Sequence, residues 1–123
     1  MLISPYDKYK EAQTQTANSS KLLLMLYDGA IRFLKLGIEG IEQGNIEKAN
    51  NNLIKTQAII NELVASLNLE YPIAHNLAQI YEYMIYQLIQ ANIKKDKQCA
   101  EEVLTHLIDM KEAWIEASRV SGM

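Results

Sequence analysis

Two histidines and one cysteine are the side chains of this sequence best suited to hold a metal ion or act as a nucleophile. A di-metal centre in a helical bundle uses Glu-x-x-His pairs on facing helices. His106 follows Glu102 by four residues instead of three, and Pro72 lies between His75 and the preceding glutamate, Glu70. Because no second pair exists to complete a site, we expect no metal site and no cofactor.

Other enzymatic chemistry has equally little support. Neither histidine is flanked by a lysine that would steady a phosphoryl group. Cys99 falls in the first turn of a predicted helix, where the helix dipole could lower the pKa of its thiol, but no histidine is spaced to act as its base. Gly37 and Gly40 lie inside another predicted helix, so we expect them to permit close approach of a neighbouring helix or a bend. We therefore do not expect an enzyme.

The length and the net charge of the chain exclude further classes of protein. A chain of 123 residues suffices for one hydrophobic core, and the single cysteine allows no internal disulfide. The net charge of -3, with lysines scattered among acids, provides no basic stripe for nucleic acid. The first residues, MLISPYDK, do not resemble a signal peptide, and no uncharged run approaches the roughly 18 residues of a membrane span. We expect a cytoplasmic protein that neither binds nucleic acid nor inserts into a membrane.

Helix start and stop signals divide the rest of the chain into four segments. These signals are Asn18, Gly44 with Asn45, the stretch 68–72 that ends in Pro72, and residues 94–96. The segments between them are roughly 22 to 25 residues long, and such short connections favour antiparallel neighbours. The sequence therefore predicts an all-α protein, an antiparallel up-down-up-down four-helix bundle over residues 18–120, preceded by a loosely held N-terminal leader at residues 1–17.

Apolar residues recur at helical spacing in each segment. The four stripes are Leu23, Leu26, Tyr27, Ala30, Phe33, Leu34, Ile38 and Ile41; Ile46, Ala49, Leu53, Ile60, Leu63 and Leu67; Ile73, Leu77, Ile80, Tyr81, Met84 and Leu88; and Ala100, Val103, Leu104, Leu107, Met110, Lys111 by its aliphatic stem, Trp114 and Ile115. Residues 83–93 carry no charge and place apolar side chains on nearly every face of their helix. Such a surplus is either enclosed by neighbouring helices or available to another protein.

Several blocks of the sequence resemble the FliS family of flagellar secretion chaperones. PYxxY at 5–9 with Thr16 and Ala17 is similar to the family's N-terminal tyrosine motif, and LLLMLYDGAI at 22–31 is similar to its most recognisable stretch. Further blocks follow in family order: NLIKxQxIIxEL at 52–63, YxYM at 81–84, ANIKxD at 91–96 and Trp114. The chain departs from the family at Ser19, where a proline is common, and at 67–72, where the turn often contains glycine.

The resemblance implies an export chaperone that binds the disordered C-terminal segment of flagellin in outer apolar grooves and delivers it to the flagellar export apparatus. Candidate client-binding residues are Met25, Leu36, Ile54, Ile59, Tyr83, Tyr86, Ile89 and Ile93. Each could equally belong to the core, because periodicity alone does not say which face of a doubly apolar helix lies inside. The family also implies that the leader covers part of this surface when no client is bound, with Ile3, Tyr6 and Tyr9 as its contacts.

Two other interpretations remain open at this level. The surplus apolar face could be buried in a structural homodimer without a client, whereas a chaperone is expected to be a monomer or a weak homodimer. The run of Asn50, Asn51 and Asn52 is unusual inside a helix, because these side chains compete for backbone hydrogen bonds. We expect it to be solvated or, alternatively, to hydrogen-bond the main chain of an extended ligand.

Overall fold

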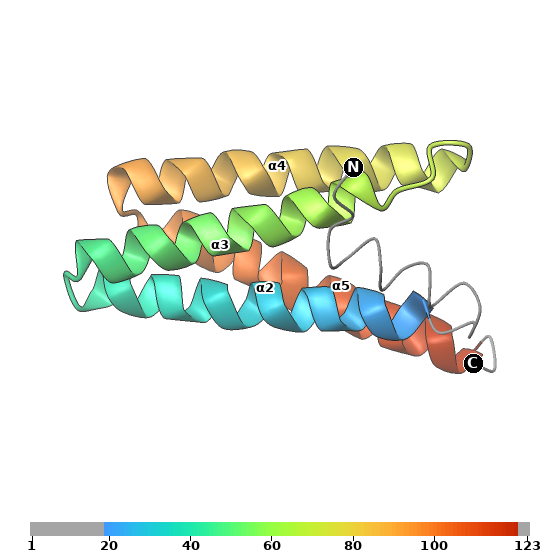
Figure 1. Cartoon of the computed structure of the whole chain (residues 1–123), viewed down its shortest axis with the longest axis horizontal. Coiled ribbons are helices and arrows are strands. Elements are labelled where there is room, and N and C mark those ends of the chain that lie inside the picture. The colour runs from blue at the N-terminus through green and yellow to red at the C-terminus, as the bar shows by residue number, and fades with distance from the viewer. Residues whose placement is uncertain (1–18, 121–123) are drawn as a thin grey trace, which may run out of the picture.

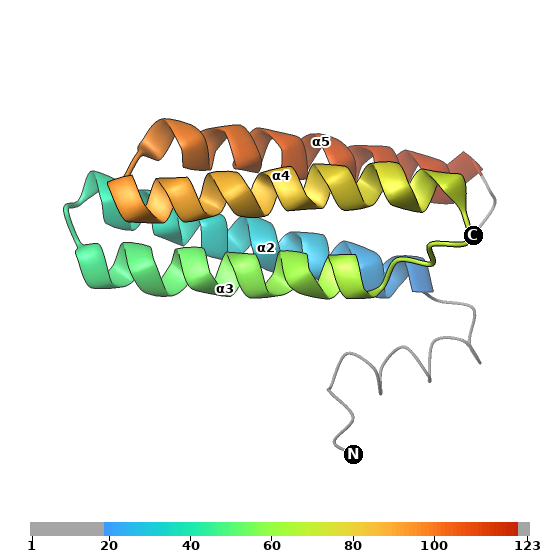
Figure 2. The same ribbon diagram turned by 90° about the horizontal axis from the view of Figure 1, so that it is seen from above.

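Four long helices make up the part of the chain that the computed structural model describes, residues 19–120 (Figure 1). They are α2 (Ser19–Glu42), α3 (Ile46–Ala65), α4 (Pro72–Lys94) and α5 (Lys97–Val120). Each helix packs against the next, and α5 returns to pack against α2, so the four form a closed bundle (Figure 2). The prediction of an all-α four-helix bundle is confirmed. The predicted leader, with Ile3, Tyr6 and Tyr9, lies outside the described residues.

The helix ends follow from local chemistry that the sequence already indicated. Asn45 caps α3, because its Oδ1 accepts a hydrogen bond of 3.0 Å from the backbone N–H of Lys48. Gly44 ends the preceding turn with a φ of +68°, which costs a glycine little. Pro72 opens α4, where its missing N–H leaves no helical bond unmade. Before α5, Asp96 accepts a 2.9 Å bond through Oδ1 from the backbone N–H two residues later.

The connection between α3 and α4 turns at an asparagine, and residues 66–71 contain no glycine. Asn68 makes the turn, because its Oδ1 accepts a 3.0 Å hydrogen bond from the N–H of Glu70 and its carbonyl accepts a 3.1 Å bond from the N–H of Tyr71. An asparagine side chain that bonds to its own backbone two residues on replaces a glycine-based turn.

The core is built from all four helices, and a pair of tyrosines lies within it. The Oη atoms of Tyr27 on α2 and Tyr81 on α4 are 2.6 Å apart, and the Tyr27 hydroxyl also reaches 3.9 Å from Sδ of Met110 on α5. Burial raises the pKa of Tyr27 above its ordinary value. Thr56 satisfies its buried hydroxyl by donating a 2.8 Å hydrogen bond to the backbone carbonyl of Asn52.

Glycines set the distance between α2 and α3. A Cβ on Gly40 would lie 2.5 Å from the backbone nitrogen of Ala49, and a Cβ on Gly37 would lie 3.0 Å from the side chain of Leu53. Both distances are shorter than ordinary carbon contacts of about 3.5–4.0 Å. The prediction that these two glycines permit close helix approach is therefore confirmed.

Four members of the predicted apolar stripes are exposed: Ile46, Ile73, Ile80 and Ile115. Ile46 and Ile73 lie in the first turns of α3 and α4, at the ends of the bundle. Ile80 and Ile115 are direct neighbours of stripe residues that face inward, and consecutive helical residues differ by about 100° around the axis. The assignment of Ile80 and Ile115 to the stripes was wrong, because a rotation of about 100° moves a side chain from the core to its margin.

Candidate protein-binding surface

Most of the residues proposed from the sequence as contacts are exposed in the structure. Six of the eight have exposed side chains, and they are Met25, Ile54, Tyr83, Tyr86, Ile89 and Ile93. Leu36 and Ile59 are half-buried, and Ile59 also packs against the core. The structure therefore places these eight residues at the surface or at the margin of the core; their role in binding stays a prediction.

One group follows the side of the bundle where α2 meets α3. A Cβ on Gly29 would lie 3.2 Å from Cδ1 of Ile59, so this face of α2 looks toward α3. Met25 precedes Gly29 by four residues and Leu36 follows it by seven, which places all three on the same face of α2. Met25, Leu36 and Ile59 together form the α2–α3 strip.

The aromatic ring of Phe33 lies near this strip, and two cationic side chains lie over it. The guanidinium carbon of Arg32 lies 4.6 Å from the ring centroid, and Nζ of Lys55 on α3 lies 5.3 Å from it. Both distances fall within the roughly 6 Å range of cation–π attraction. The α2–α3 strip is therefore bordered by positive charge.

A second group lies where α3 meets α4. Nδ2 of Asn92 on α4 donates a 2.8 Å hydrogen bond to Oδ1 of Asn50 on α3. The helices are antiparallel, so one turn forward from Asn50 to Ile54 corresponds to one turn back from Asn92, toward Ile89. Ile54 and Ile89, both exposed, therefore lie on the same side of the α3–α4 pair, and we call them the α3–α4 strip.

The asparagine run contributes to structure at two of its three positions. Asn50 bonds to Asn92, and Nδ2 of Asn52 donates a 2.8 Å hydrogen bond to the backbone carbonyl of Lys48. Asn51 is exposed. The expectation of a fully solvated run was wrong for Asn50 and Asn52, because an amide within reach of a backbone or side-chain partner pairs with it.

The outer face of α4 carries the most exposed apolar side chains of the predicted set. Tyr86 and Ile93 are seven residues apart, so they lie on one face, and the side chain of Ile93 is 73% exposed. Ile89 stands between them along the helix and connects this face to the α3–α4 strip. The uncharged run at 83–93 therefore presents its surplus apolar area outward, not only to the core.

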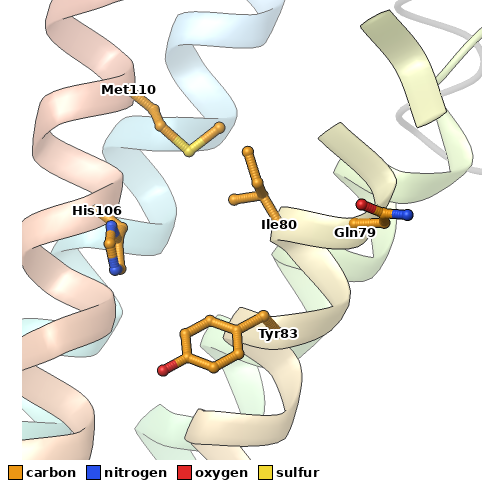
Figure 3. Close-up of a pocket in the computed structure, with 5 residues that line it drawn as sticks. All are labelled: Gln79, Ile80, Tyr83, His106 and Met110. Atoms are coloured by element: carbon orange, nitrogen blue, oxygen red, sulfur yellow. The ribbon is translucent and has the colours of Figure 1, made fainter. Parts of the chain in front are cut away.

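On the other side of α4, a pocket of about 380 Å³ opens between α4 and α5. Its lining consists of Gln79, Ile80 and Tyr83 from α4 with His106 and Met110 from α5. Figure 3 shows Ile80 and Met110 extending toward one another, the rings of Tyr83 and His106 between the two helices, and the amide of Gln79 turned outward. The pocket is thus walled mainly by apolar groups.

A carboxylate beside this pocket is hydrogen-bonded to Tyr83, one of the residues that line it. Oε1 of Glu102 accepts a 2.8 Å bond from the hydroxyl of Tyr83 and a short bond from Nε2 of Gln87. The bond from Gln87 first, and then that from Tyr83, hold the pKa of Glu102 below its usual value. The same bond to Glu102 raises the pKa of Tyr83. Glu102 is therefore an ionised group at neutral pH with a fixed orientation.

The structure also bears on the chemistry considered from the sequence. Within residues 19–120, no group of three or more His, Cys, Asp and Glu side chains is placed to hold a metal ion. Burial, reinforced by a 3.4 Å contact with Oδ2 of Asp96, raises the pKa of the Cys99 thiol. The suggestion that the helix dipole lowers this pKa was wrong, since desolvation and the nearby carboxylate disfavour the thiolate. None of the helices described here is both long and apolar enough to cross a bilayer.

Sequence reasoning missed part of the exposed apolar surface. Leu69 and Tyr71 are exposed in the connection before α4, and Ile73 and Ile80 are exposed on α4 itself. Apolar residues in a short connection were a usable signal, because loops run over the surface. Ile80 could have been found from its spacing of three residues before Tyr83, which places both on one helix face.

A family described as "Flagellar protein FliS" matches residues 2–121 of the chain. A Bacillus subtilis protein named "Flagellar secretion chaperone FliS" is 39% identical over 114 residues, which cover 93% of this chain and 86% of the relative. A protein of the same name from Salmonella typhimurium is 39% identical over 88% of this chain and 82% of the relative. Another from Vibrio cholerae is 37% identical over 85% of this chain and 78% of the relative.

Proposed function

The chain belongs to the FliS family of flagellar secretion chaperones, and we propose that it binds the C-terminal segment of flagellin before export. In this proposal the disordered segment lies across the exposed apolar strips of the bundle. The chaperone covers the part of flagellin that would otherwise associate with other subunits, and it delivers its client to the flagellar export apparatus. No covalent bond is made or broken, and the protein acts in the cytoplasm.

The observation that supports this function is the distribution of exposed apolar side chains around the bundle. The α2–α3 strip, the α3–α4 strip, the outer face of α4 and the α4–α5 pocket occur on successive sides. A compact folded partner touches one side of a bundle, whereas a segment without its own fold can pass from one side to the next. A distributed surface of this kind suits a long, flexible client.

The energetics require several anchors. Ordering a disordered segment costs on the order of 2–5 kcal/mol or more, and each fully buried large apolar side chain contributes about 1.5–3 kcal/mol. About half a dozen client side chains placed in apolar sites would leave a surplus near 8–12 kcal/mol, which corresponds to micromolar to nanomolar affinity. One strip alone is therefore insufficient, and loss of one anchor should weaken binding without abolishing it.

The test is a single charge placed in the α3–α4 strip. The side chain of Ile54 is 50% exposed, so Ile54→Asp should leave the bundle folded, while a bound client would have to desolvate the new carboxylate. We expect calorimetric titration with a flagellin C-terminal peptide to show binding weaker by about 2 kcal/mol or more, near 30-fold. Tyr83→Asp is expected to act in the same direction.

Ile115→Asp is the matched control, because Ile115 is also an exposed isoleucine but lies on α5, outside the four sites. It should bind the peptide as the unaltered chain does. Unchanged affinity for Ile54→Asp would show that this residue is wrongly assigned. A stable dimer that ignores the peptide in light scattering would instead favour a structural homodimer and overturn the proposed function.

A further inference from the structure

The α4–α5 pocket differs from the other apolar sites because it combines an apolar cavity with one oriented negative charge. Its volume of about 380 Å³ is at the small end of the range of ligand pockets, about 300–1,000 Å³. Ile80 and Met110 provide flexible aliphatic contacts from opposite helices, and the ring of Tyr83 provides a flat wall. The space is large enough to admit an aliphatic side chain, and the lining is chemically suited to one.

The carboxylate of Glu102, which is bonded to the pocket residue Tyr83, uses only one of its two oxygens in bonds to the described part of the protein. Tyr83 and Gln87 both donate to Oε1 of Glu102, and none of residues 19–120 donates to Oε2. The five residues that line the pocket include no lysine or arginine. An exposed carboxylate that is already oriented, with one free oxygen, is prepared to accept a charge-assisted hydrogen bond from a cationic partner.

From these features we propose that the α4–α5 pocket is a subsite for the client, which inserts an aliphatic side chain between Ile80 and Met110 and pairs a nearby lysine or arginine with Glu102. The inference rests on the proposed function and adds the chemistry of one client contact. Glu102 precedes His106 of the pocket lining by one turn of α5, about 5–6 Å. The cation therefore lies three or four residues from the aliphatic anchor in a helical client, or two residues from it in an extended one.

The arrangement also gives selectivity. An acidic client side chain at the position of the cation would face Glu102, and like charges in contact disfavour binding. A neutral polar side chain would gain no charge-assisted bond. The pocket thus discriminates by charge, whereas the purely apolar strips discriminate by shape and hydrophobicity.

Methionine methyl groups provide a direct test in the intact chain. Met110 lines the pocket, Met84 is fully buried in the core, and Met25 belongs to the α2–α3 strip. The full chain with ¹³C-labelled methionine methyls is titrated with the C-terminal peptide of flagellin and followed by NMR. We expect the Met110 signal to shift at saturation while the Met84 signal stays in place.

The charge pairing is tested with Glu102→Gln and a matched control. We expect Glu102→Gln to weaken the peptide about five- to ten-fold at low salt and less at high salt, because salt screens the lost ion pair. Glu101→Gln removes the adjacent exposed carboxylate, which accepts neither the Tyr83 bond nor the Gln87 bond, and should change affinity less than twofold. Replacing one lysine or arginine of the peptide by glutamine should weaken binding to the unaltered chain but not to Glu102→Gln.

The outcomes separate this inference from the function on which it rests. If the peptide binds and the Met110 signal stays in place, the pocket is not a subsite, although the chaperone function stands. If Met110 shifts but Glu102→Gln binds as tightly as Glu101→Gln, the charge pairing is wrong. If the unaltered chain binds no peptide, both the function and the inference are overturned.

Discussion

The contact between Gly40 and α3 predicts a large effect from adding a single methyl group. In Gly40→Ala the new Cβ would lie 2.5 Å from the backbone nitrogen of Ala49 and 2.9 Å from its Cα. Ordinary contacts are about 3.5–4.0 Å, so α2 and α3 must separate locally by about 1 Å. The obstacle is backbone, which has no alternative rotamer, so the strain cannot be relieved by moving a side chain.

Two opposing terms determine the size of the effect. Overpacking of this kind costs about 1–3 kcal/mol, and the backbone obstacle places Gly40→Ala near the upper end. Alanine in a helix interior is favoured over glycine by about 1 kcal/mol, which partly offsets that cost. We therefore expect the free energy of unfolding to fall by about 2 kcal/mol. For a slope near 2 kcal/mol per molar urea, the midpoint of unfolding falls by about 1 M.

Urea unfolding followed by circular dichroism measures this change, and Gly29→Ala is its matched control on the same helix. A Cβ on Gly29 meets only Cδ1 of Ile59, at 3.2 Å, and the flexible end of that side chain can move. Gly29→Ala should therefore be neutral or stabilising by up to about 1 kcal/mol. If Gly40→Ala unfolds at the same urea concentration as the unaltered chain, the close approach at Gly40 does not limit the packing of α2 on α3, and the reasoning fails.

Two further predictions concern the core and the helix ends. Tyr27→Phe removes the buried bond to Tyr81 and should lower stability at neutral pH by about 1–2 kcal/mol in urea unfolding. Burial raises the pKa of Tyr27, so the stability from its neutral hydroxyl is complete below the unfolded value near 10 and is lost as pH rises through the folded value. Tyr27→Phe should therefore flatten the decline in stability above pH 10, and an unchanged slope would contradict the assigned cause. Asn45→Ala removes the cap of α3 and should lower the free energy of unfolding by about 1 kcal/mol. Asn51→Ala, a change on an exposed side chain of the same helix, should not destabilise the protein. Equal midpoints of urea unfolding for the two variants would exclude a role for the cap.

Much of the fold was predictable because its signals are local. Asn45 marks a helix start because its side chain accepts a bond from a free backbone N–H, and Pro72 marks one because its missing N–H needs no partner in the first turn. Gly44 marks a turn through its backbone freedom. The four apolar stripes and the short connections then leave few arrangements other than an antiparallel bundle. These inferences required no knowledge of which helix lies beside which.

The candidate surface was less predictable, because exposure depends on neighbours that are distant in the sequence. Ile80 and Tyr81 are adjacent and both apolar, yet only Tyr81 finds a buried partner, on α2. From the sequence Ile59 could belong to the surface or to the core, and in the structure it is half-buried beside Gly29 of α2. The pocket and the bonds to Glu102 needed the register of α4 against α5, which no local pattern specifies.

The sequence by itself determined the helices, the capping residues Asn45 and Asp96, the bundle and the family, because each of these depends on residue types at short spacing or on similarity along the whole chain. Only the tertiary structure decided which face of α4 is enclosed and which is left open, and that a carboxylate stands beside the apolar pocket. The physical reason is that periodicity specifies the angle between side chains on one helix, whereas burial depends on where the other three helices stand around it.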